Sequence, residues 1–302
     1  DRHMLSVFAP GRGNYAYISK EREWQQTVGF FGKALMAHDT LMRVLAAEKI
    51  ASFPASPNLT AVARFEFFRR GDRLAGVWVV RQGALRFALP ITTGTKPGVA
   101  DYLPAPHGLP GFAAPVEQVL PAGASFYEMA DGRILVAGDG ADEIVPGKDG
   151  RSLRATWRRF ALVGGKSGEL IEPGFQVAVE WRVDGASLQR TETLTSSSGI
   201  TIRRLAMTLP STAGIQSAGA HGATLLVGAD APLQVRVSGD LPIAASTEWV
   251  GDEPRGRGAR GAIPLHLTFA TTDLALQPGQ SRTWVLGLEV LTVRTTIHRA
   301  TR

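Results

Sequence analysis

The stretch VEWRVDGASLQRTETLTSSSGITIRRLAMTLP, from Val179 to Pro210, decides the fold class. Apolar and polar residues alternate on both sides of Asp184-Gly185. A period of two predicts strands, because successive side chains of a strand point to opposite faces, and Asp-Gly is a common hairpin turn. The stretch therefore predicts a long antiparallel hairpin and a return strand that ends near Leu209-Pro210.

The same alternation begins after Thr60 and continues almost to the end of the chain. AVARFEFFRRGDRLAGVWVVRQGALRFALPI predicts three strands that are joined by turns at Gly71-Asp72 and Gln82-Gly83. No strand–helix–strand alternation is present, so the sheets are expected to be antiparallel. So many strands require closure, and the fold class is mainly β, a large antiparallel β-sandwich with a helical segment in front.

The N-terminal part has a different pattern. DRHM, residues 1–4, resembles a cloning scar and is left out of fold reasoning. Residues 5–58 are expected to form a helical segment, with Ser19 as a candidate N-cap. Gly29 and Gly32 leave both one long helix and two shorter helices open. Residues 59–302 are expected to form the β-sandwich domain.

Composition narrows the function classes. The chain has 302 residues, 44% hydrophobic and 20% charged, which suits a packed core. It has no cysteine, which excludes disulfides, thiol catalysis and Cys-ligated zinc. No apolar run is long enough to span a bilayer, so no membrane partner is expected. The net charge is +6 and mostly due to arginine, which suits binding of carboxylate, sulfate or phosphate, although arginines on solvated faces explain it equally simply.

No local motif in the sequence identifies a metal site or a nucleotide-binding site. GGKSGE lacks the first glycine of a P-loop, histidine pairs at metal-ligand spacing are absent, and the acidic stretch GDGADEIVPGKDG lacks EF-hand spacing. No metal and no cofactor are therefore expected. RGRGARG, which contains Arg257, is interpreted either as a mobile basic loop or as an anion-contacting loop. Nucleic-acid binding would rest on charge alone and is disfavoured.

The segment TTGTKPGVADYLPAPHGLPGF, from Thr92 to Phe112, is the candidate catalytic loop. Long irregular loops in compact domains are usually functional or disordered, and its four prolines favour a fixed path. Tyr102 and His107 are the candidate catalytic pair, and Lys96 lies nearby as a candidate substrate-binding residue. The alternative for His107 is a structural hydrogen bond, because sequence cannot show the geometry that catalysis needs.

Aromatic and basic residues outside this loop are further candidates for substrate binding. Trp157, Arg158 and Arg159 are expected to alternate on one strand, so that Trp157 stacks on a sugar while arginine binds a carboxylate. Core packing is the alternative for Trp157, because aromatic side chains supply much of any core. Trp249, which precedes the RGRGARG segment, completes the set with Arg257.

The helix-then-sheet organisation resembles that of polysaccharide lyases of the heparinase II/III and chondroitin AC types. The resemblance is carried by the hairpin from Val179 to Pro210 and by NYAYISKEREWQQTVGFFGKALMAHDTL, which looks like a last toroid helix packed on the sheets. Such proteins carry an (α/α) toroid followed by a β-supersandwich. The resemblance is one of architecture, and no catalytic motif of the family aligns with this chain.

The resemblance implies that the chain is the C-terminal sandwich part of a carbohydrate-active enzyme acting on acidic polysaccharide by β-elimination. It also implies a helical domain of the same protein as a partner, and a periplasmic or secreted location. A noncatalytic sandwich that binds glycan or packs against another domain is the alternative.

Overall fold

The computed structural model describes residues 35–44, 46–47, 61–70, 73–83, 85–92, 112, 123–137, 141–164, 170–227, 231–250, 257–258, 261–262 and 265–291. The chain divides into two compact units. One comprises Asp1–Thr60 and Gly258–Gly261, and the other comprises Ala61–Arg257 and Ala262–Arg302. In the described residues, no helix is long and apolar enough to cross a membrane.

In the first unit, residues 35–44 and 46–47 are helical. Arg43 Nε donates to Asp39 Oδ2 at 2.8 Å, an exposed pair four residues apart on the helix. Every described side chain here is exposed, and the large apolar ones are Leu35, Met36, Leu41, Met42 and Val44. The predicted helical segment is thus helical where it is described, and its Ser19 cap lies outside the described residues.

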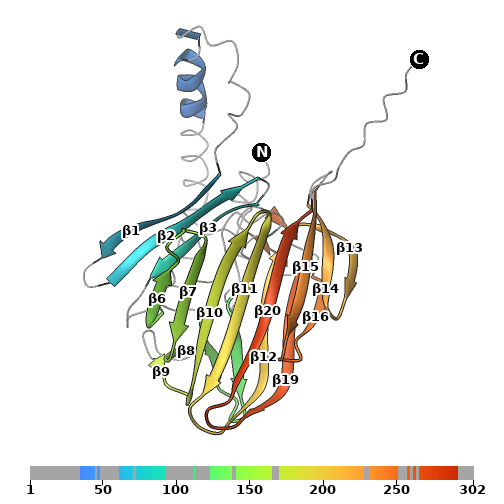
Figure 1. Ribbon diagram of the computed structural model, residues 1–302. Coiled ribbons are helices and arrows are strands. Elements are labelled where there is room, and N and C mark those ends of the chain that lie inside the picture. Colours follow the sequence, from blue (N-terminus) through green and yellow to red (C-terminus); the bar gives the residue numbers. More distant parts are fainter. Residues whose placement is uncertain are drawn as a thin grey trace, which may run out of the picture. The chain divides into compact units, whose positions relative to one another are not determined.

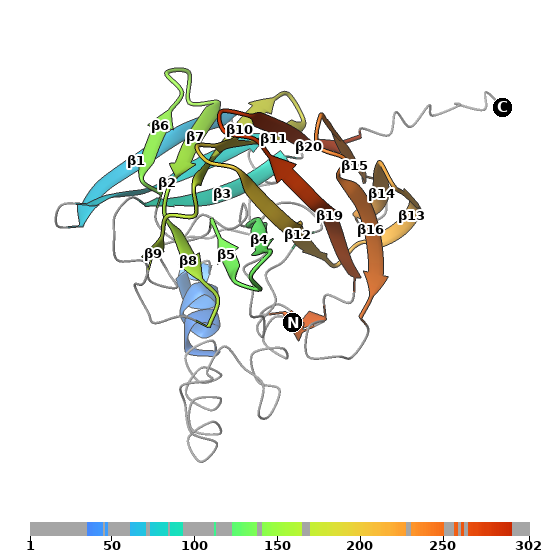
Figure 2. The same cartoon turned by 90° about the horizontal axis from the view of Figure 1, so that it is seen from below.

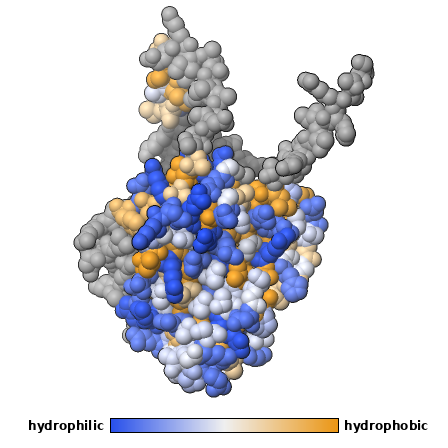
Figure 3. Space-filling model, in the orientation of Figure 1, coloured by the Kyte–Doolittle hydropathy of each residue, from blue (hydrophilic) through white to orange (hydrophobic). Residues whose placement is uncertain are grey.

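In the second unit, an eight-stranded antiparallel sheet has the order β13-β14-β15-β20-β11-β10-β7-β6 (Figure 1). Its strands are β6 (Glu143–Pro146), β7 (Ser152–Trp157), β10 (Phe175–Asp184), β11 (Ser187–Ser196), β13 (Gly214–Gly219), β14 (Gly222–Val227), β15 (Ala231–Gly239) and β20 (Ser281–Val290). Its outer face is largely hydrophilic with scattered apolar residues (Figure 3), and hydroxyl pairs such as Thr193–Thr283, 3.0 Å apart, cross between neighbouring strands.

A seven-stranded sheet in the order β16-β19-β12-β4-β5-β8-β9 forms the other layer (Figure 2). Its strands are β4 (Phe126–Met129), β5 (Ile134–Val136), β8 (Phe160–Leu162), β9 (Leu170–Ile171), β12 (Ile200–Ser211), β16 (Ala244–Trp249) and β19 (Leu265–Leu276). The pairing of these strands is antiparallel throughout. The fold is therefore a mainly β, antiparallel β-sandwich, as the sequence predicts.

Two smaller sheets complete the described strands. β1 (Val62–Arg70), β2 (Arg73–Gln82) and β3 (Leu85–Thr92) form a three-stranded sheet, and β17 (Arg257–Gly258) pairs with β18 (Gly261–Ala262). The three-stranded sheet meets the β6–β7 turn, where Trp78 Nε1 donates to the Gly150 carbonyl at 2.7 Å. The three strands predicted between Thr60 and Ile91 are confirmed.

The predicted hairpin of Val179–Pro210 is present, but its turn lies one residue later than the sequence predicts. Val179 pairs with Glu192 and Asp184 with Ser187, so Asp184 is the last residue of β10 and the turn is Gly185-Ala186. Gly185 has φ +55°, a left-handed conformation that glycine adopts without steric cost. The register places alternate residues of both strands in the core.

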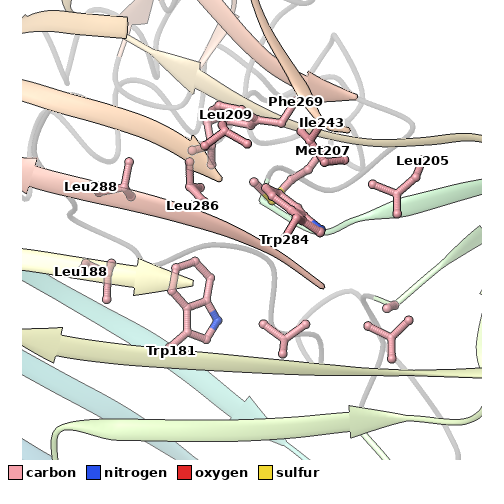
Figure 4. Close-up of a cluster of buried hydrophobic side chains, with 14 of the residues drawn as sticks. Trp181, Leu188, Leu205, Met207, Leu209, Ile243, Phe269, Trp284, Leu286 and Leu288 are labelled. Atoms are coloured by element: carbon pink, nitrogen blue, oxygen red, sulfur yellow. The ribbon is translucent and has the colours of Figure 1, made fainter. Parts of the chain in front are cut away.

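The core lies between the two large sheets. Side chains from both inner faces meet there, among them Trp181 and Leu188 of β10–β11, Trp284 of β20, and Met207 and Phe269 of β12 and β19 (Figure 4). Trp284 and Phe269 are fully buried and lie 6.3 Å apart between ring centroids. Burial of these aromatic side chains and of the aliphatic residues around them stabilises the contact between the layers.

One irregularity interrupts the seven-stranded sheet. The register between β12 and β4 shifts between Ile202 and Arg204, so β12 carries one extra residue there. On the neighbouring strand β19, Asp273 has φ +55° and is the only non-glycine residue with positive φ in the described part of the chain. Such bulges re-aim side chains and often lie beside functional sites.

Candidate functional site

Of the predicted catalytic loop, only the end residues Thr92 and Phe112 belong to the described part of the chain. Tyr102, His107 and Lys96 lie outside the described residues. Arg257 is described only as the first residue of β17. The assignment of these four residues to a site therefore stays a prediction.

Trp157 is the last residue of β7 and only 2% exposed. A ring with this burial packs in the core and offers no face to a sugar. Trp157 is therefore a core residue, which was the alternative interpretation of this tryptophan. The expected strand through Arg158 and Arg159 is wrong, because β7 ends at Trp157 and both arginines lie in a bend.

The bend is held by a carboxylate. The backbone N–H groups of Arg158 and Arg159 donate to Asp142 Oδ2 at 2.6 and 3.1 Å, and the Arg159 guanidinium pairs with Asp142 Oδ1. Partial burial raises the pKa of Asp142, but these donors outweigh it and the net pKa lies below its ordinary value. Arg158 itself stays exposed, with Glu143 3.9 Å away. Asp142 thus has a structural role in the acidic stretch.

Trp249 is the exposed aromatic residue at the end of the edge strand β16. It is 67% exposed, far more than is usual for a tryptophan. By strand alternation it lies on the side of its partner Leu265, while the adjacent Glu248 lies on the other side with its partner His266. The edge of this sheet therefore presents an aromatic ring on one side and a carboxylate on the other.

The face that carries His266 is the outer face of the seven-stranded sheet. His266 is 8% exposed and pairs in register with Glu248 on one side and Pro210 on the other. The next row along the strands consists of Ser246, Thr268 and Thr208, in which the two threonine hydroxyls lie 3.2 Å apart. On this face His266 is buried, Glu248 and Ser246 are exposed, and the two threonines are partly exposed. The carboxylate and the hydroxyl groups can form hydrogen bonds with a polyhydroxylated ligand.

A buried polar cluster lies between the sheets. Glu192 of β11 is fully buried and accepts hydrogen bonds from Ser125 Oγ at 2.5 Å, Tyr127 Oη at 2.8 Å and Arg190 Nη2 at 2.5 Å. The Arg190 guanidinium lies 5.7 Å from the ring centroid of Trp181 and 5.2 Å from that of Trp284. We call Ser125, Tyr127, Arg190 and Glu192 the core ion cluster, and it links β11 to β4.

The core ion cluster sets the ionisation of its tyrosine. Complete burial raises the pKa of the Tyr127 phenol well above its ordinary value, and the negative charge and hydrogen bond of Glu192 add to this rise. Tyr127 thus stays protonated and donates to the carboxylate. With its carboxylate satisfied by three donors, the cluster is a structural element between the sheets.

The sequence analysis missed both the core ion cluster and the polar residues around His266 on the outer face of the seven-stranded sheet. Alternation contained the signal for the first, because Arg190 and Glu192 keep the phase of the inward residues Leu188 and Leu194. The second depends on β12 and β16 lying beside β19, and alternation does not encode this strand order.

Comparisons with known proteins give the fold only. No protein-family model matches the sequence, and no curated protein matches it. Solved structures that match include a polysaccharide lyase, at 11% identity and TM-score 0.42, over 76% of this chain and 33% of that one. A heparinase III gene product matches at 10% identity and TM-score 0.39, over 94% of this chain and 42% of that one.

A proposed aldose 1-epimerase from Escherichia coli K12 matches at 12% identity and TM-score 0.38, over 76% of this chain and 99% of that one. The chain thus spans less than half the length of the two lyase structures but nearly all of the epimerase. At low identity, the chain resembles heparinase III and other polysaccharide lyases in architecture only.

Proposed function

We propose that this sandwich is the glycan-facing part of a carbohydrate-active enzyme that acts on acidic polysaccharide by β-elimination. The observation that carries the proposal is Trp249, which is 67% exposed at the end of the edge strand β16. An exposed indole suits stacking on the apolar C–H face of a sugar. On the other side of the strand, the exposed Glu248 carboxylate suits hydrogen bonds to hydroxyl groups of the polysaccharide.

The chemical step is assigned to the loop that contains Tyr102 and His107. In a β-elimination, a base removes the proton beside the carboxylate of a uronic acid, the C–O bond to the leaving sugar breaks, and an acid protonates the departing oxygen. Imidazole and phenol are suited to these two proton transfers. Lys96, Arg158 and Arg257 are assigned to the substrate carboxylate, whose charge they would offset.

A noncatalytic role in domain packing is the second candidate. The helix at residues 35–44 exposes Leu35 by 61% and Met36 by 72%, and its apolar side chains point in several directions around the helix. A helix that is apolar on several sides normally packs inside a larger body. This favours a helical domain of the same protein as its partner.

The test is incubation with polygalacturonate, hyaluronan and heparan sulfate, with ultraviolet absorbance recording the unsaturated product. We expect absorbance to rise with at least one polymer and to stop rising in the His107→Ala variant. A binding measurement on the same polymers separates the candidates, because binding without product identifies a noncatalytic module. Absence of both binding and product rejects the glycan proposal.

Trp249→Ala tests the observation that carries the proposal. We expect glycan affinity to fall about tenfold, since aromatic contacts contribute roughly 0.5–1.5 kcal/mol beyond burial. Trp249→Phe, which keeps an aromatic face, should retain most of the affinity. Because the side chain is exposed, the thermal midpoint should change little in either variant. Equal affinities in all three proteins would move the binding site away from this edge.

A further inference from the structure

The β12 bulge brings two neighbouring arginines to one face of the seven-stranded sheet. Ile202 and Leu205 are both fully buried, and the residues between them, Arg203 and Arg204, are both exposed. In a regular strand one of two successive side chains would point inward. The register shift against β4 at this place removes that alternation, so both guanidinium groups extend from the outer face.

The contacts of the two side chains confirm this direction. Arg203 Nη1 lies 3.2 Å from Glu128 Oε1, and the Arg204 guanidinium carbon lies 5.6 Å from the ring centroid of Phe126. Glu128 and Phe126 are alternate residues of β4, on the opposite side from the buried Tyr127. Both arginines therefore lean over the same strand.

The two arginines differ in how their charge is balanced. Arg203 has Glu128 as its carboxylate partner, and the arginine side chain remains 67% exposed. Arg204 forms no ion pair with any carboxylate in the described part of the chain, and the ring of Phe126 supports its guanidinium group. A guanidinium held beside an aromatic ring is oriented in advance for a planar, bidentate oxyanion.

Backbone strain at the same place is an independent observation. Asp273 of β19 has φ +55° between Thr272, which pairs with Arg204, and Leu274, which pairs with Ile202. A non-glycine residue in this conformation is strained, and such strain is found most often near functional sites. Thr272 and Asp273 are both exposed beside the bulge. They offer a hydroxyl and a carboxylate for the sugar hydroxyls that would flank an anionic group.

We propose that Arg203 and Arg204 clamp an oxyanion, a carboxylate or a sulfate, that is carried by a sugar unit of the polysaccharide. This inference rests on the proposed function and assigns it a subsite. Arg204 and Pro210, the register partner of His266, both belong to β12 and lie six residues apart. At about 3.3 Å per residue the clamp is roughly 20 Å from the His266 row. It therefore binds a different sugar unit from the one at that row.

Calorimetric titration of the full chain with three oligosaccharide probes tests the clamp. The probes are an oligogalacturonate, which carries carboxylates, a sulfated galactan oligosaccharide, and a neutral galactan oligosaccharide. We expect Arg204→Gln and Arg203→Gln each to weaken binding of at least one anionic probe about tenfold or more, because each removes a charge-assisted bond. Binding of the neutral probe should not change.

Two further variants separate the geometry of the contact from the loss of positive charge. Arg204→Lys keeps the charge but cannot form the bidentate contact, so it should also lose affinity. Arg182→Gln removes an equal charge from an exposed site on the eight-stranded sheet and serves as the matched control. The anionic probe that binds more tightly to the unmodified chain identifies carboxylate or sulfate as the natural group.

The outcomes separate the two proposals. If the unmodified chain binds an anionic probe and the Arg203 and Arg204 variants bind it as the Arg182 control does, the clamp is wrong and the glycan-binding function stands. If the unmodified chain binds neither anionic probe, the clamp is rejected, and the proposed function is decided by its own test with polygalacturonate, hyaluronan and heparan sulfate. Unchanged thermal midpoints in the variants show that a loss of affinity is not a loss of fold.

Discussion

Arg190 and Glu192 are two charged residues at positions where the alternation of β11 demands apolar ones. Their burial, at 3% and 0% exposed, is compensated by Ser125, Tyr127 and two tryptophan rings. A buried ion pair contributes little net stability compared with apolar residues, but removing one member is costly because the other remains charged and unpaired. This asymmetry makes the core ion cluster testable.

Replacing Glu192 with alanine should lower the free energy of unfolding by about 3–5 kcal/mol, since Arg190 is left buried without its carboxylate. Urea denaturation measures the change. The double variant Arg190→Met with Glu192→Leu, which removes both charges, should be more stable than Glu192→Ala. A loss below about 1 kcal/mol in the single variant would show that the pair is not desolvated.

Tyr127 predicts a distinct dependence on alkaline pH. Its folded pKa is raised by burial and by Glu192, so the unfolded chain releases the phenolic proton first as the pH rises past about 10. Stability should then fall by about 1.4 kcal/mol per pH unit from this residue, whereas it is fully retained below pH 10.

The Tyr127→Phe variant lacks this proton and serves as the comparison. Near pH 8 it should be less stable by about 1.5–3 kcal/mol, because a hydrogen bond to a charged group is lost. Urea denaturation between pH 8 and 11 should show the two free energies converging above pH 10. Parallel curves over that range would place the titrating group elsewhere.

At the scale of elements, alternation and turn residues were sufficient for the long strands. The hairpin β10–β11 and the strands β1 to β3 are where the sequence predicts them, because local patterns specify them. The end of β7 was not predictable, since it depends on Asp142 accepting hydrogen bonds from residues 16 and 17 positions later. The β12 bulge was not predictable for the same reason, because it is defined only against β4.

The junction between the three-stranded sheet and the β6–β7 turn can be tested at Gly150. This glycine has φ +73°, and a Cβ atom there would lie 2.3 Å from the Ala63 carbonyl oxygen. Gly150→Ala should therefore cost more than the roughly 1–2 kcal/mol of the left-handed conformation alone, and should speed amide hydrogen exchange in β1 and β2.

Gly185→Ala is the matched control for that substitution. Gly185 also has positive φ, at +55°, but no atom lies within 4 Å of its added Cβ. It should cost only about 1–2 kcal/mol and leave exchange in β1 and β2 unchanged. Equal effects of the two substitutions would show that the close approach at Ala63 does not hold the small sheet.

At the scale of the whole molecule, the fold class could be predicted from the sequence, but the order of the strands within each sheet could not. A period of two without intervening helices indicates an antiparallel sandwich. The order of strands is non-local, because the last strand β20 inserts between β15 and β11. The candidate edge with Trp249 and His266 depends on this kind of long-range pairing, here between β16 and β19. Exposure of Trp249 and burial of Trp157 likewise follow from assembly, not from residue type.

The core ion cluster also affects how the chain selects its pairing during folding. A slip of one residue in the β10–β11 hairpin turns its apolar side chains to water, so hydrophobicity alone rejects it. A slip of two residues keeps every apolar side chain inside, but it moves Glu192 by about 7 Å from Tyr127 and Ser125. The misaligned hairpin would then bury the Glu192 carboxylate with only Arg190 as a donor, without the hydrogen bonds from Ser125 and Tyr127. The polar residues of the core thus exclude the one class of misfolded register that its apolar residues tolerate.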